Sequence, residues 1–110
     1  MIKTYTDLEQ SERLSKILPI ESADMFYTII DQGLYLEVKQ GIEPSKDDIP
    51  CWSLAALIKL LPSVYTLKPM IDLEENSIYY SGHNTLYTNG DTLIDACINM
   101  IFKLNEQNLI

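Results

Sequence analysis

Basic residues are scarce in this chain, and this scarcity excludes the commonest modes of nucleic-acid binding. Its 110 residues include 8 lysines and arginines against 16 aspartates and glutamates, a formal net charge of −8. Arg13 is the single arginine, whereas proteins that bind phosphate backbones gather lysine and arginine on one face. We therefore expect no direct contact with DNA or RNA, and we interpret the surplus acid first as a source of solubility.

Cysteine pairs, long apolar runs and an export signal are also lacking. The two cysteines, Cys51 and Cys97, show neither the short paired spacing of a zinc site nor the density of a disulfide-rich domain. The longest apolar run, residues 54–61, contains Lys59 and is far shorter than the roughly 20 residues of a membrane span. The first residues lack the order that a secretory signal requires. We expect a cytoplasmic protein with no membrane contact, no cofactor and no metal.

Composition favours an ordinary globular protein. Hydrophobic residues make up 46% of the chain and charged residues 22%, which excludes the disordered and fibrous classes. A chain of this length buries roughly two-thirds of the surface that its unfolded form exposes. We therefore expect residues 1–110 to form a single domain that folds without disulfides.

End signals predict a helix near each terminus. The first helix begins at a capping box that opens with Thr6, and Pro19 prevents its continuation. The last helix begins with Asp91 as its N-cap or, alternatively, with a capping box that opens with Thr92. Its polar side chains form one narrow stripe at three- and four-residue steps, made up of Thr92, Asp95, Asn99, Lys103 and Glu106.

Aromatic, β-branched and alternating segments predict strands at residues 25–30, 34–39, 66–73, 77–81 and, more briefly, 85–88. A short turn containing Gly33 joins the first two as a hairpin with one solvent-exposed face. Residues 41–48 are expected to form an exposed loop. Pro69 cannot donate to a ladder, so its strand should lie at a sheet edge or carry a bulge.

The segment 51–61 has more apolar surface than so short a chain can easily cover. Only Ser53 and Lys59 are polar in it, and a proline lies on either side. A helix that is apolar nearly all round must be covered on several sides, by the rest of its chain or by a partner. Since each large buried side chain contributes roughly 1.5–3 kcal/mol, we expect a helix here that is completed by another chain around Trp52.

These elements predict an α+β fold in which an antiparallel sheet of four to five strands carries the helices on one face. The expected order is helix, two strands, helix, two or three strands, and helix.

Four segments resemble a known group of proteins. They are residues 5–11 (YTDLEQS), 17–25 (ILPIESADM), 49–57 (IPCWSLAAL) and 95–101 (DACINMI). Together they resemble short proteins encoded by gut anaerobic bacteria and by their prophages or mobile elements. The resemblance implies no activity, ligand or active-site motif. It implies an origin as an accessory protein of a phage or mobile element.

Few side chains are candidates for chemistry. His83 is the only histidine and lies in a predicted turn without a neighbouring cluster, which favours a solvated loop residue over a catalytic base or ligand. Cys51 and Cys97 fall in apolar predicted helices and are interpreted as inert core thiols, although a disulfide between them stays open. Asp47 and Asp48 are interpreted as loop residues, not as a cation site. We therefore predict no catalytic residue.

The leading functional hypothesis is a non-enzymatic protein-interaction module that associates with itself. Its interface is predicted around Trp52, Tyr79 and Tyr80, because tyrosine and tryptophan are enriched at interfaces. Tyrosine is equally common as a half-buried residue of antiparallel strands, so this assignment has a structural alternative. A second hypothesis is an acidic decoy that inhibits a host nucleic-acid enzyme, and it requires clustered carboxylates. A small enzyme that uses His83 ranks last.

Overall fold

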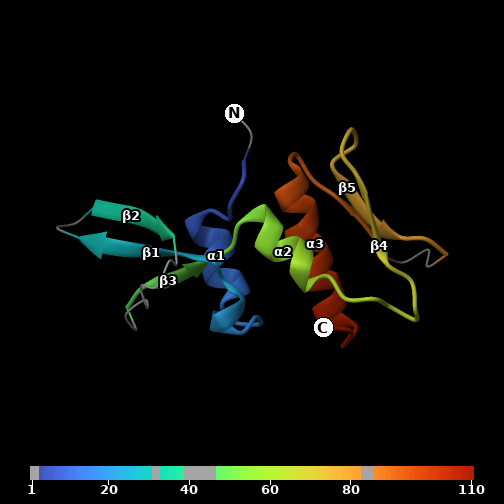
Figure 1. Ribbon diagram of the computed structural model, residues 1–110, viewed down its shortest axis with the longest axis horizontal. Helices are drawn as coiled ribbons and strands as arrows, with labels where there is room; N and C mark the ends of the chain where they lie inside the picture. Colours follow the sequence, from blue (N-terminus) through green and yellow to red (C-terminus); the bar gives the residue numbers. More distant parts are fainter. Residues whose placement is uncertain (1–2, 31–32, 39–46, 83–85) are drawn as a thin grey trace.

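The computed structural model describes residues 3–30, 33–38, 47–82 and 86–110, which form three α-helices, a short 3₁₀ helix and two antiparallel three-stranded sheets (Figure 1). The helices are α1 (Leu8–Leu14), η1 (Ile20–Ser22), α2 (Leu54–Leu60) and α3 (Leu93–Glu106). The strands are β1 (Met25–Ile30), β2 (Gly33–Val38), β3 (Ile49–Cys51), β4 (Pro69–Asp72), β5 (Ser77–Tyr80) and β6 (Tyr87–Asn89). The α+β class is confirmed, whereas the single sheet of four to five strands is wrong.

The first sheet has the strand order β2-β1-β3 and ends with a strand that the sequence did not predict. Cys51 pairs with Met25, and Pro50 pairs with Phe26. Pro50 is tolerated because β3 is an edge strand, where a missing N–H costs little. The predicted helix over residues 51–61 is therefore wrong at its start, and the expected element order lacks this strand.

Helix α2 begins only after Ser53, whose hydroxyl accepts a hydrogen bond from the Ala56 N–H. The Asp24 carboxylate in turn accepts hydrogen bonds from the Ser53 N–H, at 2.9 Å, and from its hydroxyl. Leu57 is the residue of α2 that is fully buried, whereas Ala55 and Lys59 are exposed. The middle segment is therefore not a long apolar rod, and its short helix needs no partner to cover it on every side.

The second sheet, β4-β5-β6, packs against α3. The inward side chains of β5, Ile78 and Tyr80, are buried, and the Thr88 hydroxyl of β6 donates to the carbonyl of Ala96 at 2.9 Å. Pro69 opens the edge strand β4, which confirms the prediction for that residue. Asn99 and Glu106 of the predicted polar stripe are exposed, and the Asn99 amide donates to the carbonyl of Asn89 in β6 at 2.9 Å.

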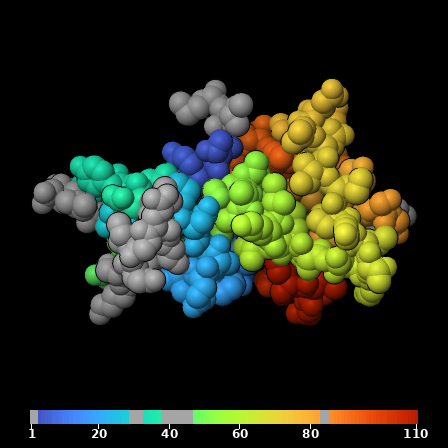
Figure 2. Space-filling view, viewed as in Figure 1, coloured from blue at the N-terminus to red at the C-terminus, as the bar shows by residue number. Residues whose placement is uncertain are grey.

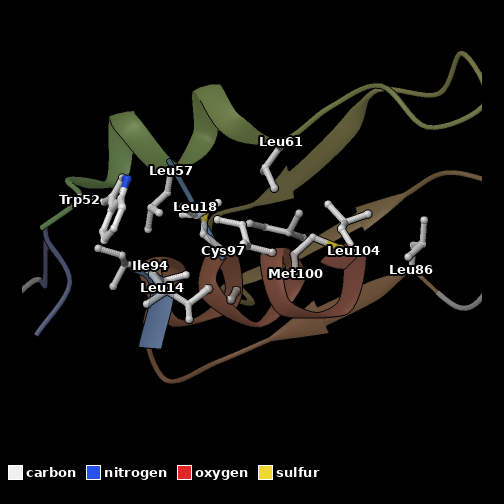
Figure 3. Close-up of a cluster of buried hydrophobic side chains, with 14 of the residues drawn as sticks. Leu14, Leu18, Trp52, Leu57, Leu61, Leu86, Ile94, Cys97, Met100 and Leu104 are labelled. Atoms are coloured by element: carbon white, nitrogen blue, oxygen red, sulfur yellow. The ribbon is translucent and has the colours of Figure 1, made fainter. Parts of the chain in front are cut away.

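The main core lies between α3, α2, the second sheet and the end of α1. Figure 3 shows Leu57 pointing from α2 toward the face of α3 that carries Cys97. Trp52 is fully buried in this core, and its indole N–H donates to the Ser22 hydroxyl at 3.0 Å. The core is made up chiefly of Leu14, Leu18, Trp52, Leu57, Leu61, Val64, Ile78, Tyr80, Leu86, Ile94, Cys97, Met100, Ile101 and Leu104.

The start of α1 differs from the sequence prediction by one residue. Asp7, not Thr6, is the N-cap, and it forms the capping box with Gln10. Thr6 is instead fully buried. At α3 Thr92, not Asp91, is the N-cap, because the Thr92 side chain accepts from the Asp95 N–H. The Asp95 carboxylate binds Lys3 and Gln10 instead of closing a capping box. None of the described helices is long and apolar enough to cross a bilayer.

Candidate functional site

The first sheet projects from one end of an elongated molecule. The chain measures 49 × 30 × 22 Å, and its radius of gyration is 14.6 Å, against about 13 Å for a compact chain of this length. The hairpin β1–β2 runs along the long axis and points away from the helices (Figures 1 and 2). This sheet is therefore the part of the molecule with the fewest neighbouring elements.

One face of the first sheet is apolar throughout. The register places Leu36 and Ile49 on either side of Tyr27, and it places Leu34 opposite Ile29 at the distal end. Side chains directly opposite each other in an antiparallel ladder lie on the same face. Tyr27 is buried, Leu36 and Ile49 are half-buried, and Leu34 is 46% exposed. The apolar face thus becomes progressively more exposed toward the tip.

Strand β2 exposes a large apolar side chain on each face. Tyr35 is 52% exposed on the face opposite to Leu34, and Glu37, on the same face as Tyr35, is also exposed. In the described part of the chain β2 pairs with β1 alone, so one of its sides has no neighbouring strand. We call this outer side of β2, with Leu34, Tyr35, Leu36 and Glu37, the β2 edge.

The β2 edge lacks the protection that the other described sheet edges have. β3 has three residues and contains Pro50, β4 opens with Pro69, and β6 has only three residues. Proteins protect edge strands from pairing by making them short or by placing proline or lysine on them. Strand β2 has six residues, no proline and no lysine. It is therefore the described edge that is best suited to pair with another strand.

A buried polar cluster attaches the first sheet to the rest of the molecule. The Thr6 hydroxyl lies 2.7 Å from the Ser11 hydroxyl and accepts from the Trp52 N–H at 3.1 Å. The Tyr27 hydroxyl donates to the carbonyl of Thr6 at 2.7 Å, and the Thr6 hydroxyl lies 3.4 Å from the Cys51 sulfur. These bonds join α1, β1 and β3 at the base of the sheet, so they hold it in its projecting orientation.

Replacing Thr6 tests this cluster. The substitution Thr6→Val keeps the side-chain shape but leaves the buried Trp52 N–H without its acceptor, because the hydroxyl is lost. We expect the free energy of unfolding to fall by about 1–3 kcal/mol, measured by urea denaturation. Thr6→Ser keeps the hydroxyl and should lose less. Equal losses for the two variants would show that the hydroxyl does not matter.

A second polar network ties the N-terminal segment to α3. The Asp95 carboxylate accepts from the Lys3 ammonium at 3.0 Å and from the Gln10 amide at 2.8 Å. Burial opposes the ionisation of Asp95, but the hydrogen bonds from Gln10 and Lys3, with the charge of Lys3, outweigh it and lower the pKa of Asp95. The folded state therefore favours the ionised carboxylate.

The pH dependence of stability follows from this lowered pKa. Stabilisation by a carboxylate whose pKa is lowered on folding is complete above its ordinary value of 3.8 and is lost as the pH falls below it. We expect the melting temperature of the unmodified protein to fall over that range. Asp95→Asn should reduce this acid-dependent part and leave the slope above pH 5 unchanged. If the melting temperature of the variant fell with pH in the same way, Asp95 would not contribute to the acid dependence.

Two of the three residues predicted at the interface are buried. Trp52 is 0% exposed and Tyr80 is 2% exposed, and the Tyr80 hydroxyl donates to the carbonyl of Pro62 at 2.7 Å. Burial raises the pKa of Tyr80 to about 12. Both side chains face the core of their own chain and present no surface to a partner, so their assignment to an interface is corrected.

Tyr79 does lie on an outer face. The register places it between Met70 and Tyr87, and this row crosses the second sheet on the side away from α3. Met70 is 47% exposed and Tyr87 is 49% exposed, whereas Tyr79 between them is more buried. The row is bounded by β4, which opens with Pro69, and by the three-residue β6, so the described part of this sheet offers no long unpaired edge to another strand.

The candidate chemical residues are not gathered in one place. Cys51 and Cys97 are both free and fully buried, in β3 and α3. Burial raises the pKa of Cys97 to about 12 and also raises the pKa of Cys51, in spite of opposing hydrogen bonds. His83 lies outside the described residues. In the ranges that the structure describes, no group of three His, Cys, Asp or Glu side chains could hold a metal ion.

Two hollows of about 310 and about 400 Å³ lie on the surface, one between η1 and α2 and one beside Lys3 and Leu73. Every buried side-chain nitrogen or oxygen among the described residues already has a hydrogen-bond partner. The hollows therefore contain no buried polar atom that is held ready for a ligand.

Several acidic side chains have structural roles. Asp7 caps α1, Asp24 binds Ser53, and Asp95 binds Lys3 and Gln10. Asp72 accepts from two backbone N–H groups of the turn between β4 and β5. These carboxylates accept hydrogen bonds from groups of their own chain.

The sequence interpretation did not recognise the β2 edge as a site. The sequence predicts a hairpin strand over residues 34–39 with one exposed face. The structure has this strand as β2 (Gly33–Val38), and Lys39 lies outside the described residues. The available signal was a six-residue strand without proline beside a short turn. In comparisons with known proteins, no protein-family model, curated protein or solved structure matches the chain.

Proposed function

We propose that this protein is a non-enzymatic interaction module that associates with a second copy of itself through the first sheet. The observation that carries the proposal is the unprotected β2 edge, which exposes Leu34 and Tyr35 on opposite faces. A strand with these properties recruits other strands by backbone hydrogen bonding. The three other described edges do not offer this.

The β2 edge is complementary to a second copy of itself. In an antiparallel pair of β2 strands, Leu34 and Leu36 can meet apolar side chains of the same face, and Tyr35 can lie opposite Glu37. A symmetric contact of this kind uses the same surface on both copies. A second copy is therefore the partner that this edge fits.

Charge favours a small, apolar contact over an ionic one. Each copy carries a formal net charge of −8, so two copies repel each other at a distance. The contact must gain its free energy from backbone pairing and apolar burial. Added salt screens the repulsion, so it should strengthen self-association, whereas salt weakens the binding of an acidic decoy to a basic enzyme.

Sedimentation equilibrium tests the proposal on the unmodified chain. We expect a monomer–dimer equilibrium between 12.6 kDa and twice that mass over about 10 to about 500 μM protein. The dimer fraction should rise as NaCl increases from about 0.05 to about 0.5 M. A single 12.6 kDa species at every concentration and salt level would overturn the proposal.

The remaining predictions are compatible with this role. The two free cysteines agree with a reducing compartment, and we propose the cytoplasm. The origin in a phage or mobile element stays a prediction. Four of the described carboxylates bond within their own chain, so they are less available for the decoy hypothesis.

A further inference from the structure

We infer that two copies pair antiparallel along the β2 edge, with Leu36 on the two-fold axis, and form one six-stranded sheet in the order β3-β1-β2-β2-β1-β3. This inference rests on the proposed self-association and specifies its geometry. Each first sheet supplies three strands, and β2 is the outer strand on the side away from β3. The joined sheet would leave only the two short β3 strands, which contain Pro50, as edges.

Symmetry limits the registers that are available. Two antiparallel neighbouring strands related by a two-fold axis keep the same side-chain faces, so a residue pairs only with one an even number of positions away. Leu34 and Leu36, on the apolar face, must therefore meet apolar-face residues of the other copy. The axis then passes midway between the two copies of one β2 residue, and these two copies pair with each other.

Charge and strand length select Leu36 among these residues. An axis at Glu37 would set two carboxylates directly opposite each other, which is destabilising. An axis at Tyr35 would place Glu37 opposite Gly33, which offers it no side-chain partner. An axis at Leu36 pairs all five residues from Leu34 to Val38, with Tyr35 opposite Glu37 twice. The phenol of Tyr35 can then donate to the carboxylate of Glu37.

Single cysteine substitutions test the register. With Leu36 on the axis, Leu36→Cys places two thiols directly opposite each other, within the Cα separation of about 4.4–6.8 Å that a disulfide requires. In Tyr35→Cys the two substituted Cα atoms would lie about 8 Å apart, and in Leu34→Cys about 14 Å apart, so both pairs are too distant for a disulfide. Cys51 and Cys97 are fully buried and serve as internal negative controls.

We expect mild oxidation to convert most of the Leu36→Cys protein to a covalent dimer of twice 12.6 kDa, seen by non-reducing electrophoresis. Tyr35→Cys, Leu34→Cys and the unmodified chain should give at least tenfold less dimer. A covalent dimer from Tyr35→Cys but not from Leu36→Cys would overturn this register. Circular dichroism would first establish that each variant is folded.

A mixed experiment keeps the inference testable if Leu36→Cys fails to fold. Leu34→Cys and Val38→Cys chains should form little covalent dimer separately but a heterodimer when mixed, because residues 34 and 38 face each other across the axis. If the unmodified chain dimerises in sedimentation but neither experiment gives crosslinks, edge pairing fails while self-association stands. If the unmodified chain is monomeric, both fail.

Discussion

Replacing Trp52 by alanine should lower the free energy of unfolding by about 3–5 kcal/mol, the largest effect that we expect from a single substitution. The side chain is fully buried, and it packs between α2, α3 and the end of α1. Removing it leaves a cavity where the main core meets the base of the first sheet. Since domains of this size have only about 5–15 kcal/mol of stability, the variant should be close to unfolding.

The control for this prediction is Trp52→Phe, which keeps most of the apolar volume but loses the N–H that binds Ser22. We expect a distinctly smaller loss. Denaturation should be followed by circular dichroism, because these substitutions remove the only tryptophan. A loss below about 1 kcal/mol for Trp52→Ala would mean that the side chain is not part of the core.

Tyr35→Glu should raise the dissociation constant of the dimer at least tenfold, or about 1.4 kcal/mol. The substitution sets a carboxylate opposite Glu37 at two symmetric positions, and it removes an aromatic side chain that is 52% exposed in the monomer. Like charges directly opposite in neighbouring strands are destabilising. Sedimentation equilibrium measures the change.

Tyr87→Glu provides a matched control for this prediction. Tyr87 is 49% exposed on β6, in the second sheet, so the same change in charge and size occurs away from the β2 edge. We expect its dissociation constant to stay within about twofold of the unmodified protein. Tyr35→Lys should also retain the dimer, because lysine opposite Glu37 is attractive. A stronger effect from Tyr87→Glu would move the interface to the second sheet.

Helix α3 and the first hairpin could be predicted from the sequence, but strand β3 could not. The pattern of α3 extends over 14 residues, the aromatic and β-branched residues of β1 cover six, and the alternation in β2 covers another six. β3 has three residues, too few for a pattern. Pro50 is favourable at a helix start and tolerable in an edge strand, so local preference could not separate the two.

The division into two sheets depends on pairing between distant residues. Once Cys51 pairs with Met25, β3 completes the first sheet, and the chain crosses through α2 to build a second one. The residue preferences within each strand are nearly the same whether the strands form one sheet or two. The number of sheets was therefore not available from local patterns.

The predicted interface was centred on the wrong side chains for a physical reason. The sequence predicts Trp52 and Tyr80 at an interface because tryptophan and tyrosine are enriched there, but their large apolar surfaces also favour burial in their own core. The β2 edge is exposed because β3 occupies the other side of β1. Its proposed role in pairing depends on this topology, whereas residues such as Leu34 and Tyr35 are common in strands.

Small-angle X-ray scattering tests the central claim most directly. A two-fold axis at Leu36, in the projecting first sheet, places the helices of the two copies on opposite sides, so the dimer is distinctly longer than one 49 Å molecule (Figure 1). We predict that the maximum dimension grows from about 50 Å at low concentration to about 70 Å at high concentration and moderate salt. A maximum dimension that stays near 50 Å at every concentration would contradict self-association through the first sheet.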